Sequence, residues 1–460
     1  MHTVKLYDGT TTITLTSGSY TVNNYDMATA NINVQEVQSE LIRNRFKKAV
    51  YSPITDRLRI TIIGSSPADA QAKYQAIESM LQFALRSINI PSAQRLYLKV
   101  QLSSDSDEWV SDVLYGTIEP SEDMWVGIPQ SVIEANITIV RDILRGPTTQ
   151  LSLSNSHGSG TSVTVYNHED SSHKNSATIT TTIEGTLPSP VKLRLKNSYG
   201  SAVTFKTINF GINTHSTPST FDHILESDES LFGSTVSDSS CSNGSKKTAT
   251  VTESSTILYK FAWLLDKDFL AKTKGESFIM LARFVGSPPN NVLLAPQVGT
   301  YDSPLFFPTW TGNEVLASDY EEIINLGSVS LPGPTYIAGT NYSYGVAIGA
   351  RGIAAGTPTL TLDYVMLIPS DSWAKMRQSS SLLMANNEYV VLDDIEQEYV
   401  YQKGSPNYEK LPVFSKRGNQ LNVWPDRTNK IMVNWESTSA ATIDWTAVLE
   451  AWYQPRRLTL

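Results

Sequence analysis

Near residue 160 the chain gathers side chains that could bind a metal: His157, His168, Glu169, Asp170 and His173. Imidazole and carboxylate groups are the usual protein ligands of Zn²⁺ and related ions. These residues lack a regular spacing, however, and they lie in a polar loop, where exposed histidines are common. We therefore expect histidines in contact with solvent here rather than a metal site.

Sequence patterns of the common catalytic sites are missing. The chain has no Gly-x-Ser-x-Gly, no His-Glu-x-x-His, no Walker loop and no dinucleotide fingerprint. Two pairs of carboxylates, Glu321-Glu322 and Asp393-Asp394, are adjacent in the sequence. Neighbours on a strand point to opposite faces, so neither pair can flank one glycosidic bond. We expect no enzymatic activity, and the sequence leaves open only a dispersed acid–base pair.

Length and composition indicate a mainly β protein of several domains. A chain of 460 residues is long enough for two to four domains, each with its own core. Ser and Thr are abundant and short alternating apolar runs recur, which favours strands. The net charge of −9 argues against a dedicated, sequence-specific nucleic-acid binder, which normally has a basic surface. A single cysteine, Cys241, excludes an intrachain disulfide framework and indicates assembly in a reducing cytoplasm.

The sequence gives no sign of export or membrane insertion. The first residues, Met1 to Leu6, lack the apolar segment of a signal peptide. No apolar run approaches the 18 residues typical of a transmembrane helix. A protein of this kind that works outside a cell would be released by lysis, which points to a virus particle.

Residues 1–148 have the pattern of a β-domain with one helix. Strand-like alternation precedes and follows a helical segment near 67–88, in which Ser66 is the expected N-cap and Asp69 the carboxylate at the third helical position. Apolar residues at helical spacing define one buried face of this helix. This order resembles the tail-tube-type fold that begins the distal tail proteins of long-tailed (siphovirus) bacteriophages.

The segments 149–215 and 371–460 have the pattern of one discontinuous β-sandwich. A strand with alternating cations, Val191 to Asn197, is followed much later by Asn387 to Asp394 and by Tyr399 to Gly404. The order of these strands, with a final strand closing on Pro455-Arg456, is similar to the C-terminal sandwich of distal tail and minor tail proteins. The Pro-Gly turn of that family is replaced here by the longer Pro425 to Thr428, which changes the local loop.

We expect residues 216–370 to form an insertion between the two halves of the sandwich. They contain Ile224 to Glu229, Ser239 to Gly244, Gly275 to Phe284 and Leu362 to Pro369. These segments resemble the strands of a jelly-roll carbohydrate-binding module that contains calcium. The resemblance implies a structural Ca²⁺ held by Glu226, Asp228 and Asp363, with Asp in place of the second Glu of the family; the alternative is solvated charges on edge strands. Two carboxylates from opposite ends of the insert would hold the sandwich closed.

Aromatic residues in the loop-rich part of this insert could stack on the apolar faces of sugar rings. The candidates are Trp310, Tyr301, Tyr336, Tyr342 and Tyr344. Trp310 lies in a Pro, Thr, Gly and Asn-rich stretch that favours an exposed side chain. Trp263 alternates with Phe261 and Leu265, and we expect it in the core.

The resemblances together imply a structural component of a phage tail tip or baseplate. In that family the first domain forms rings, which are hexameric, and binds tail-tube and tail-tip or hub proteins. The insert would bind a polysaccharide of the host surface. Two alternatives stay open: a glycan-degrading tail enzyme (a depolymerase), and a purely architectural tail subunit with a decorative insert.

Overall fold

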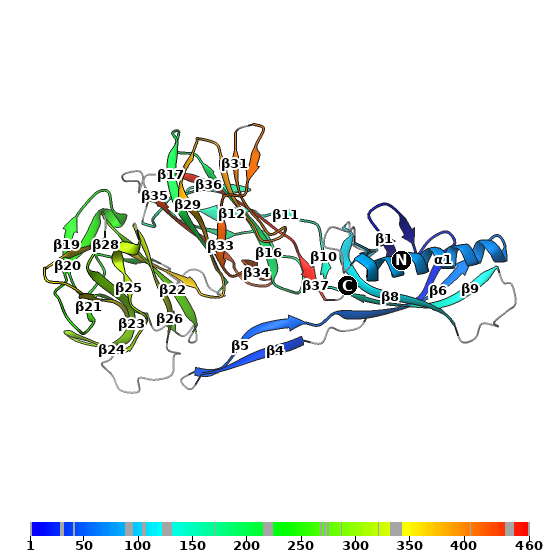
Figure 1. Ribbon diagram of the computed structural model, residues 1–460, viewed down its shortest axis with the longest axis horizontal. Helices are drawn as coiled ribbons and strands as arrows, with labels where there is room; N and C mark the ends of the chain where they lie inside the picture. Colours follow the sequence, from blue (N-terminus) through cyan, green and yellow to red (C-terminus); the bar gives the residue numbers. More distant parts are fainter. Residues whose placement is uncertain are drawn as a thin grey trace. The chain divides into compact units, whose positions relative to one another are not determined.

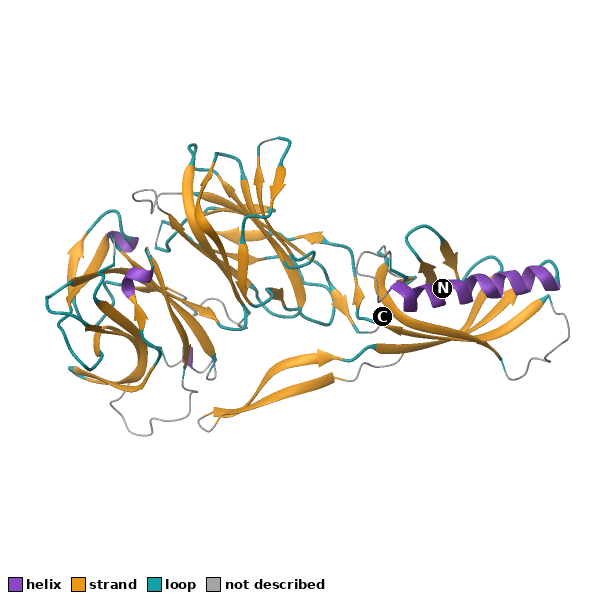
Figure 2. Cartoon of the chain, viewed as in Figure 1, coloured by secondary structure: helices purple, strands orange, loops and turns teal. Residues whose placement is uncertain are grey.

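The computed structural model describes residues 2–27, 32–39, 42–87, 95–103, 107–121, 131–170, 172–214, 224–266, 269–270, 273, 276–286, 288–320, 322–331, 343–404, 406–437 and 446–458. The mainly β fold expected from the sequence is confirmed: antiparallel sheets dominate (Figures 1 and 2). The chain forms two compact units, and we describe each by itself. Among the described residues, no helix is long and apolar enough to span a membrane.

The first unit comprises Met1–Thr149, Glu184–Ser189 and Gln454–Leu460. Our expected boundaries assign the last two segments to the sandwich, whereas here β37 pairs with β10 in the sheet of the first unit. The strands of this sheet are β1 (Thr3–Tyr7), β2 (Thr12–Thr14), β3 (Tyr20–Met27), β6 (Ile54–Ile63), β7 (Tyr97–Gln101), β8 (Trp109–Pro120), β9 (Val132–Arg141), β10 (Leu144–Arg145) and β37 (Arg456–Arg457). A separate hairpin joins β4 (Ile32–Ser39) and β5 (Ile42–Tyr51).

Helix α1 (Pro67–Ser87) covers one face of this sheet. Its start follows the expected cap, because the Asp69 N–H donates to Ser66 Oγ at 3.2 Å and Asp69 Oδ2 accepts from the Ser65 N–H at 2.7 Å. On the sheet, β6 and β9 alternate strictly, so Leu58, Ile60 and their neighbours pack under the helix. The opposite face of the sheet carries polar residues.

The second unit contains a two-sheet sandwich, called here the sandwich. One sheet consists of β11 (Thr149–Gln150), β14 (Ser162–Val165), β16 (Ser189–Asn197), β30 (Tyr389–Asp393), β31 (Glu398–Lys403), β32 (Glu409–Leu411), β34 (Asn422–Val423) and β36 (Ala447–Tyr453). The other consists of β12 (Leu153–Asn155), β13 (Gly158–Gly160), β15 (Ser176–Ile179), β17 (Val203–Asn213), β29 (Trp373–Met384), β33 (Ser415–Gly418) and β35 (Lys430–Ser437).

Residues 224–369 of the same unit, called the insert, supply two further sheets. The first contains β18 (Ile224–Glu226), β19 (Ser234–Ser237), β20 (Ser245–Thr250), β22 (Ser277–Phe284), β26 (Ile323–Ser330) and β28 (Thr359–Pro369). The second contains β21 (Leu258–Leu264), β23 (Val292–Asp302), β24 (Leu305–Thr311), β25 (Val315–Leu316) and β27 (Ser343–Gly352). Short 3₁₀ turns are η2 (Ser242–Gly244) and η3 (Ala317–Asp319). One apolar core lies between the two sheets, and it includes the buried Trp263, as expected.

The two ends of the insert lie next to each other. The chain leaves the sandwich after β17 and returns in β29, and these two strands are antiparallel partners that pair Gly211 with Trp373. Within the insert, the first strand β18 pairs with the last strand β28, with Ile224 opposite Met366. A module whose ends meet can be accommodated at one turn of another domain without separating that domain's strands.

A buried ion pair crosses the sheet of the first unit and gives a stability prediction. Asp56 on β6 accepts hydrogen bonds from Arg141 Nε at 2.5 Å and from the Tyr25 hydroxyl at 3.0 Å, and both charged side chains are fully buried. Asp56→Ala leaves the Arg141 charge uncompensated, so we expect a loss of about 3–5 kcal/mol in the free energy of unfolding. Chemical denaturation followed by circular dichroism measures it.

The same pair of strands provides a matched control. Arg59 and Glu134 form an ion pair of 2.8 Å between β6 and β9 on the exposed face. Glu134→Gln should cost no more than about 1 kcal/mol, as is usual for exposed pairs. Equal losses of unfolding free energy in the two variants would contradict the stabilising role assigned to the buried Asp56–Arg141 pair.

Candidate functional sites of the insert

Three carboxylates of the insert converge on the 3₁₀ turn η2. Glu226 Oε1 accepts from the Ser242 hydroxyl at 2.8 Å, and Asp363 Oδ1 accepts from the Ser242 N–H at 2.8 Å. The Asn243 side-chain amide donates to Asp228 Oδ2 at 3.0 Å. The three residues that the sequence predicts as calcium ligands thus all bind groups of this one turn, Ser242 and Asn243.

Asp363 is also the partner of a buried cation. It is the extra residue of a β-bulge in β28, between Leu362 and Tyr364, which pair with Phe284 and Arg283 of β22. Its Oδ2 accepts from Arg283 Nη1 at 2.8 Å. Burial raises the pKa of Asp363 to about 6, although the Arg283 charge acts to lower it. Inside the module each of the two charges compensates the other.

These residues fit a bound cation in part. Asp228 Oδ1 is buried and lacks a hydrogen-bond partner among the described residues, as expected for an atom placed to ligate an ion. Asp363, by contrast, already uses both oxygens for Ser242 and Arg283. Within the described part of the chain, Glu226, Asp228 and Asp363 do not bring three ligand oxygens within 4.8 Å of one another. Calcium binding at this turn stays a prediction, and further ligands would have to come from backbone oxygens or water.

The aromatic candidates divide between the two faces of the second sheet of the insert. Trp310 pairs with Val298, and Tyr344 pairs with Thr300, so both lie on the same face of the sheet. Tyr301 lies on the opposite face, half-buried against Phe306. Tyr336 and Tyr342 lie outside the described residues.

An exposed apolar strip follows the edge strand β24. Leu305, Phe307 and Trp310 are 49%, 46% and 43% exposed. A bulge between Pro308 and Trp310 puts all three on the same face of this strand, at the end of the sheet. Phe307 was not among the expected residues, although its place in Leu305-Phe306-Phe307 is a signal: in an alternating strand, two of three consecutive apolar residues point the same way.

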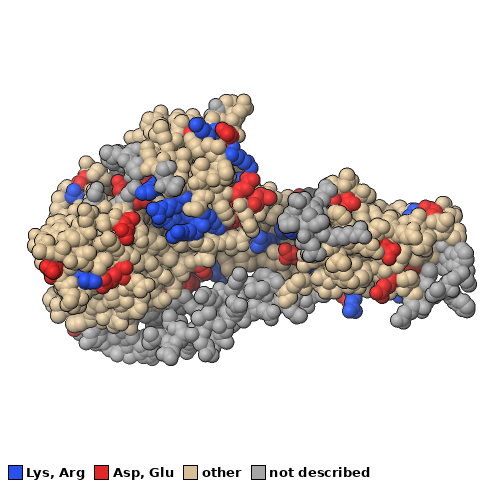
Figure 3. Space-filling model, viewed as in Figure 1, with Lys and Arg blue, Asp and Glu red and all other residues tan. Residues whose placement is uncertain are grey.

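Basic residues gather on one face of the sandwich (Figure 3). Figure 3 shows Lys and Arg side chains concentrated over the region of β29 and β33. Burial lowers the pKa of Lys375 on β29, whereas the negative charge of Glu436 acts to raise it. The neighbouring positive charges of Arg377, Arg417 and Lys206 lower this pKa further. This is a local concentration of positive charge on a chain of net charge −9.

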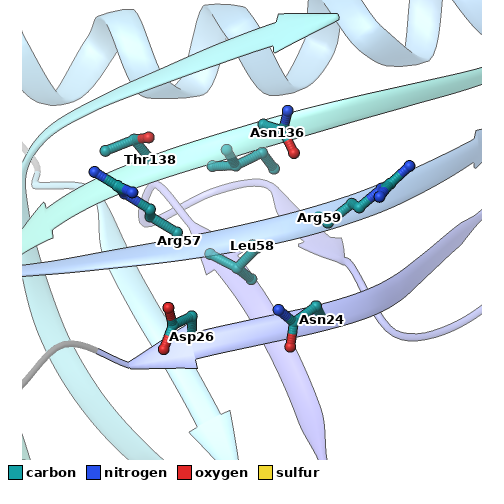
Figure 4. A pocket seen from close by; sticks show the side chains of 8 residues that line it. Asn24, Asp26, Arg57, Leu58, Arg59, Asn136 and Thr138 are labelled. Carbon is teal, nitrogen blue, oxygen red and sulfur yellow. The ribbon is translucent and has the colours of Figure 1, made fainter. Parts of the chain in front are cut away.

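The first unit carries a shallow hollow on the sheet face away from α1. Its volume is about 410 Å³. Figure 4 shows the side chains that line it, which are Asn24, Asp26, Arg57, Leu58, Arg59, Asn136, Ile137 and Thr138. Arg57 lies opposite Asp26 in the register of β3 and β6, so cations and anions alternate across the face. The lining offers no concentrated charge or nucleophile for chemistry.

Comparisons with known proteins find similarity only at the level of structure. No family model matches the chain, and no curated protein matches its sequence. A crystal structure of the SPP1 Dit (gp 19.1) protein, described as a paradigm of the hub adsorption apparatus in phages infecting Gram-positive bacteria, aligns over 99% of both chains at TM-score 0.38 and 6% identity. A structure of the phage p2 baseplate in its activated conformation with Sr aligns over 100% of both chains, at TM-score 0.28 and 11% identity. A structure of the same baseplate with Ca aligns over 99% of this chain and 98% of that one, at TM-score 0.28 and 10% identity.

The structural neighbours are thus phage hub and baseplate proteins. Because the TM-scores lie below 0.5, the function has to be argued from the chain itself.

The calcium prediction can be tested at Asp228. We expect Ca²⁺ to raise the unfolding temperature of the full chain, because an ion at about 100 times its Kd stabilises the folded state by about 2.7 kcal/mol. Asp228→Asn should remove this shift, since its buried oxygen would no longer carry charge. Differential scanning calorimetry with Ca²⁺ and with a chelator measures the effect.

Asp238 is the matched control, because it lies in the same region but binds Lys246 at 2.7 Å. Asp238→Asn should keep the Ca²⁺ shift. A wild-type chain that is indifferent to Ca²⁺, or an Asp228→Asn variant that still responds, would refute calcium binding at this turn.

Proposed function

We propose that this chain is a structural component of a phage tail tip that forms a ring and presents a glycan-binding module for adhesion to the host. The observation that carries the proposal is the way in which the insert is joined to the sandwich. A complete two-sheet module, with its own core and adjacent ends, is placed between partner strands β17 and β29 of a second sandwich. Such an arrangement displays a binding module on a scaffold.

The first unit supports a role in assembly. One face of its sheet is covered by α1, whereas the other is polar and carries alternating charges such as Arg59 and Glu134. A mixed polar face of this kind suits the wall of a water-filled tube. The hairpin β4–β5 pairs only within itself among the described strands, so its edges are available to neighbouring subunits. Ring formation through such edges, with tail-tube and tip proteins as further partners, is part of the proposal.

The strip on β24 supports sugar binding. Trp310 and Phe307 expose their rings on one face, next to an edge, where a polysaccharide could lie along the strand. Aromatic rings pack against the C–H faces of sugars while neighbouring polar groups bind the hydroxyls. Each copy in a ring would add one such site, so weak single contacts would combine into strong attachment.

The alternatives make different predictions. In a depolymerase the insert would release reducing ends from a host polysaccharide, whereas the described residues of the strip contain no pair of facing carboxylates. In a purely architectural subunit the insert would bind no glycan, and exposed rings on β24 would have no ligand. Glycan binding without release of reducing ends distinguishes our proposal from both.

The glycan prediction rests on Trp310 and Phe307. On an array of bacterial surface polysaccharides, we expect the full chain to bind a subset, and Trp310→Ala to weaken that binding by about 2 kcal/mol, or about 30-fold. Phe307→Ala should weaken it in the same direction. Both rings are nearly half exposed, so neither variant should lose much stability.

Trp424 provides the matched control. It is also exposed, but it lies in a sandwich turn, where it stacks on Arg427. Trp424→Ala should bind glycans as the wild type does. If Trp310→Ala and Phe307→Ala retain full binding, or if no polysaccharide binds, the adhesive role of β24 is wrong.

A further inference from the structure

The loop between β14 and β15 brings together three of the five side chains that lie near one another in the sequence, His168, Asp170 and His173. His173 Nδ1 lies 3.0 Å from both oxygens of Asp170, and His168 Nε2 lies 3.4 Å from Asp170 Oδ2. One ligand atom from each residue lies within 4.8 Å of the other two. The expectation of exposed histidines is wrong for His168, which is only 1% exposed, whereas His157 is exposed as expected.

We propose that His168, Asp170 and His173 form a binding site for a divalent transition metal of the Zn²⁺ class. In a tetrahedral site with ligands at 2.0–2.1 Å, neighbouring ligand atoms are roughly 3.4 Å apart. The two separations that Asp170 makes are close to this value, so an ion could bind with small movements of the side chains. Three protein ligands leave a fourth position for water, and Asp170 and His173 are partly exposed, which gives the ion a path of entry.

The buried imidazole of His168 presents Nε2 to Asp170, and Nε2 is therefore the atom that would ligate the ion. Its other ring nitrogen, Nδ1, lacks a partner within the described part of the chain and is not the atom that faces Asp170. The nearby cation Arg283 is compensated by Asp363 at 2.8 Å.

The backbone already holds the ligands in place. Asp170 Oδ1 accepts from the N–H groups of Ser172 at 2.6 Å and His173 at 2.8 Å, which fixes the turn and leaves Oδ2 toward the two rings. The Tyr166 ring packs edge-on against the His173 ring, with centroids 4.6 Å apart. The carboxylate of Glu169 is instead bound to Ser176 and to lysines, so it is not counted as a ligand.

The site lies where the insert meets the sandwich. The side-chain amide of Asn167 bonds the backbone of Trp435 on β35, and the Asn167 carbonyl accepts from the Tyr364 hydroxyl on β28 at 2.6 Å. Two residues further along the loop, the backbone carbonyl of Glu169 accepts from the Ser242 hydroxyl of the insert at 3.3 Å. An ion bound to this loop would therefore stiffen the contact between the two modules.

Metal titration of the full chain tests the proposal. After treatment with EDTA, we expect one Co²⁺ per chain to bind with the visible ligand-field absorption of a low-coordinate site, and Zn²⁺ to displace it. His173→Ala and Asp170→Asn should each weaken Co²⁺ binding at least about tenfold, since even losses outside the ligand shell cost about 10–100-fold. Hydrogen exchange should show slower exchange in residues 166–175 with Zn²⁺.

His157 is the matched control, because it is an exposed histidine that stacks on Tyr166 but lies outside the trio. His157→Ala should bind Co²⁺ as the wild type does. Circular dichroism without metal checks that the half-exposed His173→Ala variant is folded. No Co²⁺ binding by the wild type up to millimolar concentration, or unchanged binding in folded His173→Ala, would overturn the proposal.

Discussion

Strand β28 of the insert is buried on both faces, and this double burial fixes the module on its scaffold. One face, with Leu362, Val365 and Leu367, belongs to the core of the insert. The other, with Tyr364, Met366 and Ile368, packs with Met432 of the sandwich. The approach is close enough that a side chain on Gly211 of β17 would put its Cβ 2.3 Å from Ile368 Cγ2. Glycine at this position is thus a condition of the contact.

The bulge at Asp363 separates the two roles of this strand. An extra residue in one strand shifts the alternation of its side chains, so the strand can pack inward at Leu362 and outward at Tyr364. The extra residue is charged, and it is compensated by Arg283 on the neighbouring strand. Beyond the bulge, the Tyr364 hydroxyl donates to Asn167 and accepts from Asn434, so polar contacts set the position of the apolar face. These contacts hold the insert against the sandwich.

Local patterns in the sequence predicted local structure well. The cap at Ser66, the helix after it and the core position of Trp263 follow from spacing over a few residues, and the structure confirms them. The run Tyr364 to Ile368 also carries its own signal, because an uninterrupted apolar strand is typical of burial on both faces. Arg283, a single cation in the apolar strand Ser277–Phe284, signals a buried partner in the same way.

Features that depend on distant contacts could not be predicted. The burial of His168 arises in a loop that packs against strands lying far along the chain, and no local pattern distinguishes it from the exposed His157. Tyr301 lies on one face of its sheet, and Trp310 and Tyr344 lie on the other. This difference depends on strand register, which cannot be predicted from the loop-like composition of this region. The segments 184–189 and 454–460 pair with each other at Gly185 and Arg456, and Arg456 pairs with Arg145 of the first unit; both pairings join residues more than 250 positions apart in the sequence.

The proposed tail-tip role requires that copies of the chain assemble into a closed ring. The mass of the purified full chain in solution, measured by light scattering over a wide range of concentrations, tests this most directly. We predict a discrete species of several chains, with a mass that becomes constant once the ring closes. A single-chain mass at every concentration, or a fixed dimer that releases reducing ends from polysaccharide, would contradict the account.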